Sequence, residues 1–118
     1  MSSSAFREPL HILGAGSIGL LWAASIRSAL PSYPVTLLLR DHHRSRVKDD
    51  QMNVSWKRLH QKSSPSEVSL PIQSLDCTER IHTLVLTTKA YQAKDAVRSV
   101  LYRLDSSTSN IIVSCNVA

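Results

Sequence analysis

The stretch LHILGAGSIG, residues 10–19, carries the strongest structural signal in this chain of 118 residues. Its first four residues form a short apolar run that ends at a glycine, which is the pattern of a buried β-strand. Beyond the glycines, apolar side chains recur at helical spacing until Pro31, which cannot continue a helix. They are Ile18, Leu21, Trp22, Ile26 and Ala29. The stretch therefore predicts a strand, a tight turn and the beginning of a helix.

A second apolar run follows the predicted helix at residues 35–39. It is nearly continuous, as expected of a parallel strand that is covered on both faces. Strand, glycine turn, helix and strand together occupy about 30 residues, which is the size of a βαβ unit.

Further along the chain, the period of the apolar residues changes. Asp41 is a candidate N-cap for a short, polar helix that extends to about residue 50. Apolar and polar residues then alternate over residues 52–56 and again over residues 68–72. Because a turn-rich segment separates these two runs, they predict a pair of antiparallel strands with one exposed face.

The last part of the chain returns to the strand–helix–strand pattern. Residues 84–86 and residues 111–113 are apolar runs, and a second helical stripe lies between them. The stripe consists of Ala93, Val97, Val100, Leu101 and Leu104. These patterns predict one domain over residues 1–118, with a Rossmann-type, doubly wound α/β fold. Its sheet is expected to be mainly parallel, with a small antiparallel excursion.

The glycine loop, Gly14-Ala15-Gly16-Ser17-Ile18-Gly19, contains all three glycines of the chain. It stands directly after a strand and opens a helix, where dinucleotide-binding proteins place the GxGxxG pattern. Gly14 permits the tight turn, Gly16 lets the backbone approach a pyrophosphate, and Gly19 lets the helix pack close to the sheet. The helix N-terminus adds free N–H donors. We therefore predict that this loop binds the pyrophosphate of a dinucleotide.

The residues after the second strand distinguish NADP from NAD. An acidic residue at this place binds the ribose 2′-hydroxyl of NAD, whereas an arginine accommodates the 2′-phosphate of NADP. Arg40 is the first residue beyond the apolar run, and a guanidinium matches a phosphate in a bidentate geometry. Asp41 is the rival, since a strand that ends one residue later would put it in the ribose position. The pattern favours NADP(H) as the cofactor.

Charge and composition restrict the other partners. The net charge of +5 and the sequence pI of about 9.6 indicate an anionic partner. The basic run after residue 39 lacks interleaved aromatics, so we expect no nucleic-acid binding. No apolar run approaches the ~18 residues of a membrane span, and no His or Cys pair has metal-ligand spacing. With no recognisable leader and no disulfide pattern, the predicted location is cytoplasmic, with the mitochondrion as the alternative.

The segment Thr88-Lys89-Ala90-Tyr91-Gln92 extends the evidence from fold to family. With the glycine loop and Arg40, it resembles the N-terminal domain of the ketopantoate reductases (2-dehydropantoate 2-reductases), in which a strand is followed by Lys-Ala-aromatic-Gln and a helix. The likeness covers residues 11–116. It implies an NADPH-dependent oxidoreductase that reduces 2-dehydropantoate, a 2-keto acid, to pantoate in pantothenate biosynthesis.

The resemblance also implies roles for single residues. Gly14 to Gly19 would hold the pyrophosphate, Arg40 the 2′-phosphate, and Lys89 would lie beside the cofactor. Asn116 would lie near the nicotinamide and the substrate. From the residues alone, Lys89 follows a buried strand at the sheet edge where open α/β sheets bind ligands, and Asn116 follows the last strand at the same edge.

The chain departs from the family in two places. The family has Asn-Gly after the last strand, whereas this chain has Asn116-Val117, and valine disfavours a positive φ. The family's proton-donating lysine lies in a C-terminal helical domain, which we expect to be absent from a chain that ends at Ala118. Two alternatives therefore stay open: a non-catalytic NADP(H)-binding, sensing or interaction module, and a reductase of another 2-keto acid.

Overall fold

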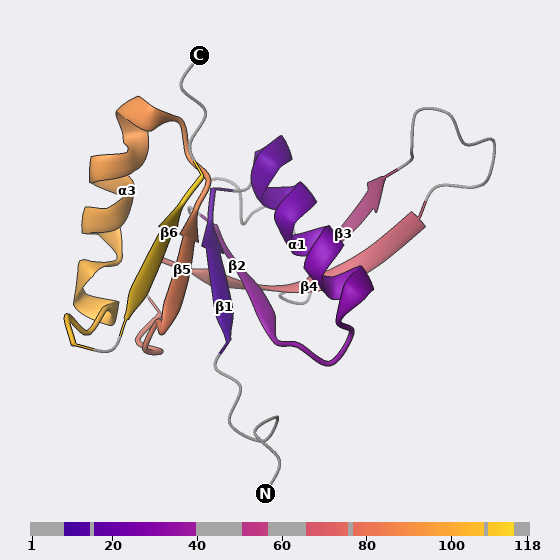
Figure 1. Ribbon diagram of the computed structural model, residues 1–118, viewed down its shortest axis with the longest axis horizontal. Coiled ribbons are helices and arrows are strands. Elements are labelled where there is room, and N and C mark those ends of the chain that lie inside the picture. The colour runs from indigo at the N-terminus through magenta and orange to yellow at the C-terminus, as the bar shows by residue number, and fades with distance from the viewer. Residues whose placement is uncertain are drawn as a thin grey trace, which may run out of the picture.

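The computed structural model describes residues 9–14, 16–39, 51–56, 66–75, 77–107 and 109–114, with only the backbone of Ser17. Its strands are β1 (Leu10–Leu13), β2 (Val35–Leu39), β3 (Gln51–Trp56), β4 (Ser66–Ser74), β5 (Thr83–Leu86) and β6 (Asn110–Val113). They form one sheet in the order β3-β4-β2-β1-β5-β6 (Figure 1). Every pairing is parallel except that of β3 with β4. The predicted mainly parallel α/β fold with an antiparallel excursion is confirmed.

Side chains of the central strands alternate between two cores, one on each face of the sheet. Ile12, Leu37 and Val85 belong to the core under helix α1 (Ser17–Ala29). Leu13 and Leu38, their neighbours in sequence, belong to the core under helix α3 (Ala93–Ser99). Because successive side chains of a strand point to opposite faces, strands buried on both faces are almost continuously apolar. This explains why these strands were recognisable from the sequence.

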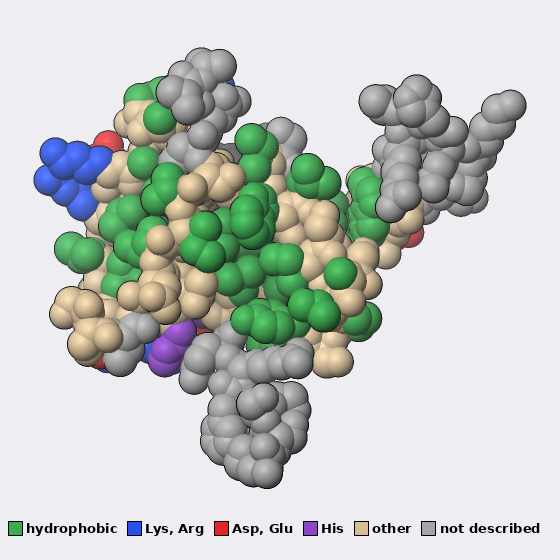
Figure 2. Space-filling model, in the orientation of Figure 1, with side chains coloured by type: hydrophobic (Ala, Val, Ile, Leu, Met, Phe, Trp, Pro, Cys, Tyr) green, Lys and Arg blue, Asp and Glu red, His purple; other side chains and the backbone are tan. Residues whose placement is uncertain are grey.

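The predicted face of α1 is only partly right. Trp22 and Ile26 pack, half-buried, against the core. Ile18, Leu21 and Ala29 are exposed instead, with Leu21 exposed to 59%. Hydrophobic side chains accordingly gather over α1 on the face seen in Figure 2. In the part of the chain that the structure describes, no helix has the length and apolar character to cross a membrane.

Small residues take the central place on the buried face of α1. Ala23 and Ala24 are almost completely buried, and Gly19 is buried one turn before Ala23. Residues four apart lie on the same face of a helix, so Gly19 and Ala23 form one narrow contact with the sheet. The helix therefore lies close to the strands, and larger side chains flank this contact rather than forming it.

The antiparallel excursion is joined to the main sheet through β4. Ser66 to Pro71 pair with β3, and Ile72 to Ser74 pair in parallel with β2. Both strands are half-exposed in alternation, as predicted, but Leu70 and Ile72 enter the core under α1. The polar helix predicted over residues 41–50 lies outside the described residues.

The second helix is shorter than predicted. A 3₁₀ turn, η2 (Ala90–Gln92), precedes α3, which ends at Ser99, and a second one, η3 (Leu101–Arg103), follows. The prediction that Leu101 lies in the apolar stripe is wrong, because Leu101 is 58% exposed. The shift from 3.6 to 3.0 residues per turn rotates Leu101 outward and Arg103 inward. Arg103 is 1% exposed.

The strand predicted over residues 111–113 is confirmed as β6, at the edge of the sheet. It pairs in parallel with β5, and all four of its side chains are exposed. Ile111 and Ile112 are each 44% exposed.

Candidate functional site

Three parallel strands end at one edge of the sheet, and the candidate site follows their ends. Leu13 of β1 is level with Leu38 of β2 on one side and with Leu86 of β5 on the other. The chain leaves β1 into the glycine loop and leaves β5 into Thr87 and Thr88. Ligands of open α/β sheets bind at this carboxyl edge, between neighbouring strands whose following helices lie on opposite faces of the sheet, as α1 after β1 and α3 after β5 do here.

The first and last glycines of the loop are required by its geometry. Gly14 has a φ of +116°, a backbone conformation that residues with a side chain rarely adopt. An added Cβ on Gly19 would lie 1.9 Å from the Gly14 carbonyl oxygen. The predicted structural roles of the two glycines are therefore confirmed: Gly14 forms a tight turn, and Gly19 allows close packing of the helix.

The middle glycine faces open space. Apart from its chain neighbours and the backbone of its own helix, no described residue has an atom within 4 Å of the place where a Cβ on Gly16 would stand. Gly16 is the N-cap of α1, and its carbonyl accepts the first helical hydrogen bond, from the Leu20 N–H at 3.0 Å. The amides before Leu20 have no partner within the helix, and no acidic residue occupies the first turn. The N-terminus of this 13-residue helix therefore suits an anionic group.

Thr87 connects the end of β5 to the glycine loop. Its backbone N–H donates to the Leu13 carbonyl at 3.0 Å. Its hydroxyl lies 2.8 Å from the Gly14 carbonyl oxygen and 3.2 Å from that of Leu13. Thr87 is 8% exposed, so these contacts are shielded from water.

The other predicted site residues are placed only in part. Lys89 lies two residues beyond Thr87, with an exposed side chain. Ala15, Arg40 and Asn116 are outside the described residues, and so is the side chain of Ser17. Among the residues that are described, no group of three or more His, Cys, Asp or Glu side chains could hold a metal ion.

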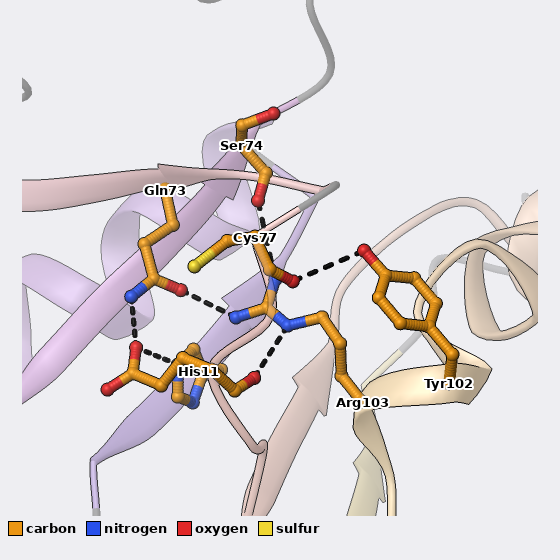
Figure 3. A network of polar contacts seen from close by, with 7 residues as sticks. His11, Gln73, Ser74, Cys77, Tyr102 and Arg103 are labelled. Atoms are coloured by element: carbon orange, nitrogen blue, oxygen red, sulfur yellow. Dashed lines mark hydrogen bonds and ion pairs between the residues drawn. The ribbon is translucent and has the colours of Figure 1, made fainter.

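A polar network centred on the buried side chain of Arg103 lies on the face of the sheet that α3 covers (Figure 3). The Arg103 guanidinium donates to the Glu79 carbonyl at 2.8 Å, the Gln73 side-chain oxygen at 2.6 Å and the Ser74 carbonyl at 3.3 Å. The Gln73 amide donates in turn to the Glu79 carboxylate. Nearby, the Tyr102 hydroxyl donates to the Leu75 carbonyl at 2.5 Å. The network joins β4 and the segment before β5 to η3.

His11 of β1 borders this network and is completely buried. Its Nε2 atom lies 3.6 Å from Oε2 of Glu79, which is too far for a hydrogen bond but close enough for a charge interaction. Burial lowers the pKa of His11, because a buried imidazolium loses its hydration, and the Glu79 carboxylate partly opposes this shift. His11 is therefore a neutral core residue at pH 7.

Two of these residues were missed by sequence reasoning. Thr87 comes directly after the strand predicted over residues 84–86, at a position that faces the loop after the neighbouring strand. Arg103 was missed because it lies within the predicted helix but outside its apolar stripe, and an arginine at such a position is expected on the surface. Only the change to a 3₁₀ turn after Ser99 brings it inside.

The sequence of the chain matches a known protein family. The sequence model described as "Ketopantoate reductase PanE/ApbA" matches residues 10–117. The chain is 29% identical over 113 residues to a 2-dehydropantoate 2-reductase of Saccharomyces cerevisiae, covering 91% of this chain and 30% of the relative. It is 36% identical over 110 residues to a probable 2-dehydropantoate 2-reductase of Schizosaccharomyces pombe, covering 87% of this chain and 31% of the relative.

Solved structures agree with the fold. A putative 2-dehydropantoate 2-reductase from Enterococcus faecalis superposes with a TM-score of 0.68 at 18% identity, over 92% of this chain and 34% of that one. A dimeric ketopantoate reductase from Staphylococcus aureus superposes with a TM-score of 0.63 at 18% identity, over the same shares of the two chains. The chain thus spans about a third of the length of the proteins that it matches.

Proposed function

Since the chain belongs to the ketopantoate reductase family, we propose that it is the NADP(H)-binding part of an oxidoreductase that reduces 2-dehydropantoate to pantoate. One observation carries the proposal. The open backbone at Gly16, the uncapped N-terminus of α1 and the positive φ of Gly14 make a cradle that fits a pyrophosphate. The names of the two yeast relatives support the reaction.

The choice of NADP(H) over NAD(H) rests on Arg40. This residue follows directly after Leu39, the last residue of β2, and it is an arginine where NAD sites have an acidic residue. A guanidinium at this position pairs with the 2′-phosphate that NADP has and NAD lacks.

The proposed work of this chain is to bind and orient the cofactor. When bound, a reduced nicotinamide supplies a hydride to the keto carbon. The backbone N–H groups of the glycine loop hold the pyrophosphate, Lys89 offers a cation at the same edge, and Asn116 orients the nicotinamide and substrate. The forming alkoxide needs a proton, and we propose that a general acid from another part of the complete enzyme supplies it.

We propose a small-molecule 2-keto acid as the substrate partner and the cytoplasm as the compartment. The 2-dehydropantoate reductases among the relatives support this substrate class. A reductase acting in metabolism needs neither nucleic acid nor a membrane as partner.

A fluorescence titration of the 118-residue chain with NADPH and with NADH tests the cofactor assignment. We expect NADPH to bind more tightly, because only its 2′-phosphate reaches Arg40. Arg40→Ala should weaken NADPH binding by about tenfold or more, the effect of losing charge-assisted hydrogen bonds, and should leave NADH binding unchanged.

Arg98→Ala is the matched control, since Arg98 is an exposed arginine of α3 and its removal changes the net charge equally. If NADH binds as tightly as NADPH, or if both alanine variants bind NADPH like the parent chain, the NADP assignment is wrong.

A further inference from the structure

We propose that Thr87 is the positioning residue of the cofactor site: its hydroxyl fixes the Gly14 carbonyl and so sets the direction in which the glycine loop leaves β1. This inference rests on the proposed function and assigns a part in it to a residue outside the GxGxxG pattern.

The contacts of Thr87 divide between backbone and side chain. The backbone N–H donates to the Leu13 carbonyl and continues the pairing of β5 with β1. The hydroxyl approaches the Gly14 carbonyl at 2.8 Å, which is the shorter of its two contacts. A substitution that removes only the hydroxyl therefore leaves the strand register intact and changes the contact to the loop.

The Thr87 hydroxyl is closely packed between two glycines of the loop. An added Cβ would lie 2.8 Å from the Thr87 hydroxyl oxygen if built on Gly14 and 2.7 Å from it if built on Gly19. The oxygen is thus enclosed by the first and last glycines of the loop. Both glycines are needed because Thr87 and the Gly14 carbonyl already occupy the space between β1 and α1.

Fixing one carbonyl orients the chain that follows it. A peptide unit is planar, so the direction of the Gly14 carbonyl determines the plane of the peptide bond that leads toward Gly16. Without the hydroxyl, the part-buried Gly14 carbonyl would lose its side-chain donor, and the turn would gain other orientations. Because a phosphate site depends on several N–H groups that point at one place, such freedom weakens binding.

Thr88 provides an internal comparison. It is the same residue type at the next position, and its buried hydroxyl has no hydrogen-bond partner among the described residues. Replacing a hydroxyl that has no partner with a methyl group of the same shape costs little. Thr88→Val is therefore the matched control for Thr87→Val.

Titration of the 118-residue chain and its variants with NADPH tests the proposal. We expect Thr87→Val to weaken binding by about five- to tenfold, as for one lost hydrogen bond, while Thr87→Ser and Thr88→Val stay within about twofold of the parent. Binding of adenosine 2′-monophosphate, which has no 5′-phosphate for the loop to hold, should be the same in all four proteins.

Several results would overturn the proposal. Thr87→Val could bind NADPH like the parent, or Thr87→Ser could lose as much affinity as Thr87→Val, which would assign the effect to packing. Should Thr87→Val not fold, Thr87→Ala against Thr87→Ser isolates the hydroxyl in the same way. Equal NADPH affinity of that pair would also contradict the proposal.

A measurement without cofactor separates this inference from the proposed function. Amide hydrogen exchange of Gly16 and Gly19 should be faster in Thr87→Val than in the parent and unchanged in Thr88→Val. If the parent does not bind NADPH, the proposed function fails, and the exchange rates still decide whether Thr87 positions the loop. Unchanged exchange in Thr87→Val would overturn the positioning role.

Discussion

At the scale of single residues, the three glycines of the loop differ in what a side chain would meet. A Cβ added to Gly19 would collide with the Gly14 carbonyl and with the Thr87 hydroxyl, whereas a Cβ added to Gly16 would stand in open space. One glycine therefore serves the packing of α1 on the sheet, and the other serves the proposed approach of a phosphate. Their substitution should separate stability from binding.

Gly19→Ala should destabilise the fold by about 1–3 kcal/mol, the typical cost of overpacking, although alanine favours a helix. Gly16→Ala should leave the free energy of unfolding within about 0.5 kcal/mol of the parent and weaken NADPH binding, because its methyl group would occupy the space of the pyrophosphate. Urea unfolding and NADPH titration of both variants provide the measurements. Equal stability of the two variants would show that Gly19 is not required for packing.

At the scale of elements, the change from α3 to η3 creates a buried cation. Arg103 belongs to a three-residue 3₁₀ turn, yet its guanidinium makes three hydrogen bonds inside the molecule. Two of its acceptors are Gln73 and Ser74 at the end of β4. The turn therefore links the end of β4 to the segment before β5.

Arg103→Met should lower the free energy of unfolding by about 2–3 kcal/mol, because methionine fills similar space but leaves the part-buried Glu79 carbonyl and Gln73 side-chain oxygen without their donor. Arg98→Met, on the exposed side of α3, should change it by less than about 0.5 kcal/mol. Chemical denaturation of the two variants is the test, and a stability loss of the same size in both would contradict the structural role of Arg103.

Elements with a strong period could be predicted from the sequence, and elements defined by tertiary contacts could not. The strands at residues 10–13, 35–39 and 84–86 are nearly continuous apolar runs, interrupted by His11 and Thr36, so burial on both faces identified them. The buried face of α1 was misjudged because the close contact uses alanines, which a search for large apolar residues overlooks. The glycine loop could be located, but Thr87 contacts it across 73 residues of sequence, and no local pattern shows such a contact.

At the scale of the whole molecule, stability should depend on pH through His11. Burial lowers its pKa in the folded chain, whereas in the unfolded chain the pKa is near 6.5. As the pH falls through this value, the unfolded chain takes up a proton that the folded chain still refuses. The free energy of unfolding is therefore greatest above pH 6.5 and falls as the pH approaches the lower, folded-state pKa.

His11→Leu should reduce this dependence, since leucine is of similar size and has no proton to exchange. Between about pH 7.5 and about pH 5.5, the parent should lose more of its unfolding free energy than the variant, as measured by urea denaturation. Glu79 and Arg103 are present in both proteins, so the difference isolates His11. Parallel pH profiles would show that protonation of His11 is not coupled to folding.

Strand β4 pairs with two partners, and we expect these two pairings to form at different times during folding. Trp56 and Ser66 close a loop of about 10 residues, whereas Leu37 and Ile72 are about 35 residues apart in the chain. Hairpins form within microseconds, and parallel pairings between distant segments form later because they close longer loops. We therefore expect this one continuous strand to form its hydrogen bonds in two stages, first at its beginning and then at its end. Gln73 and Ser74 lie in the part of β4 that pairs with β2 and is expected to form later. Arg103 is therefore expected to form its hydrogen bonds to them only when the sheet is nearly complete.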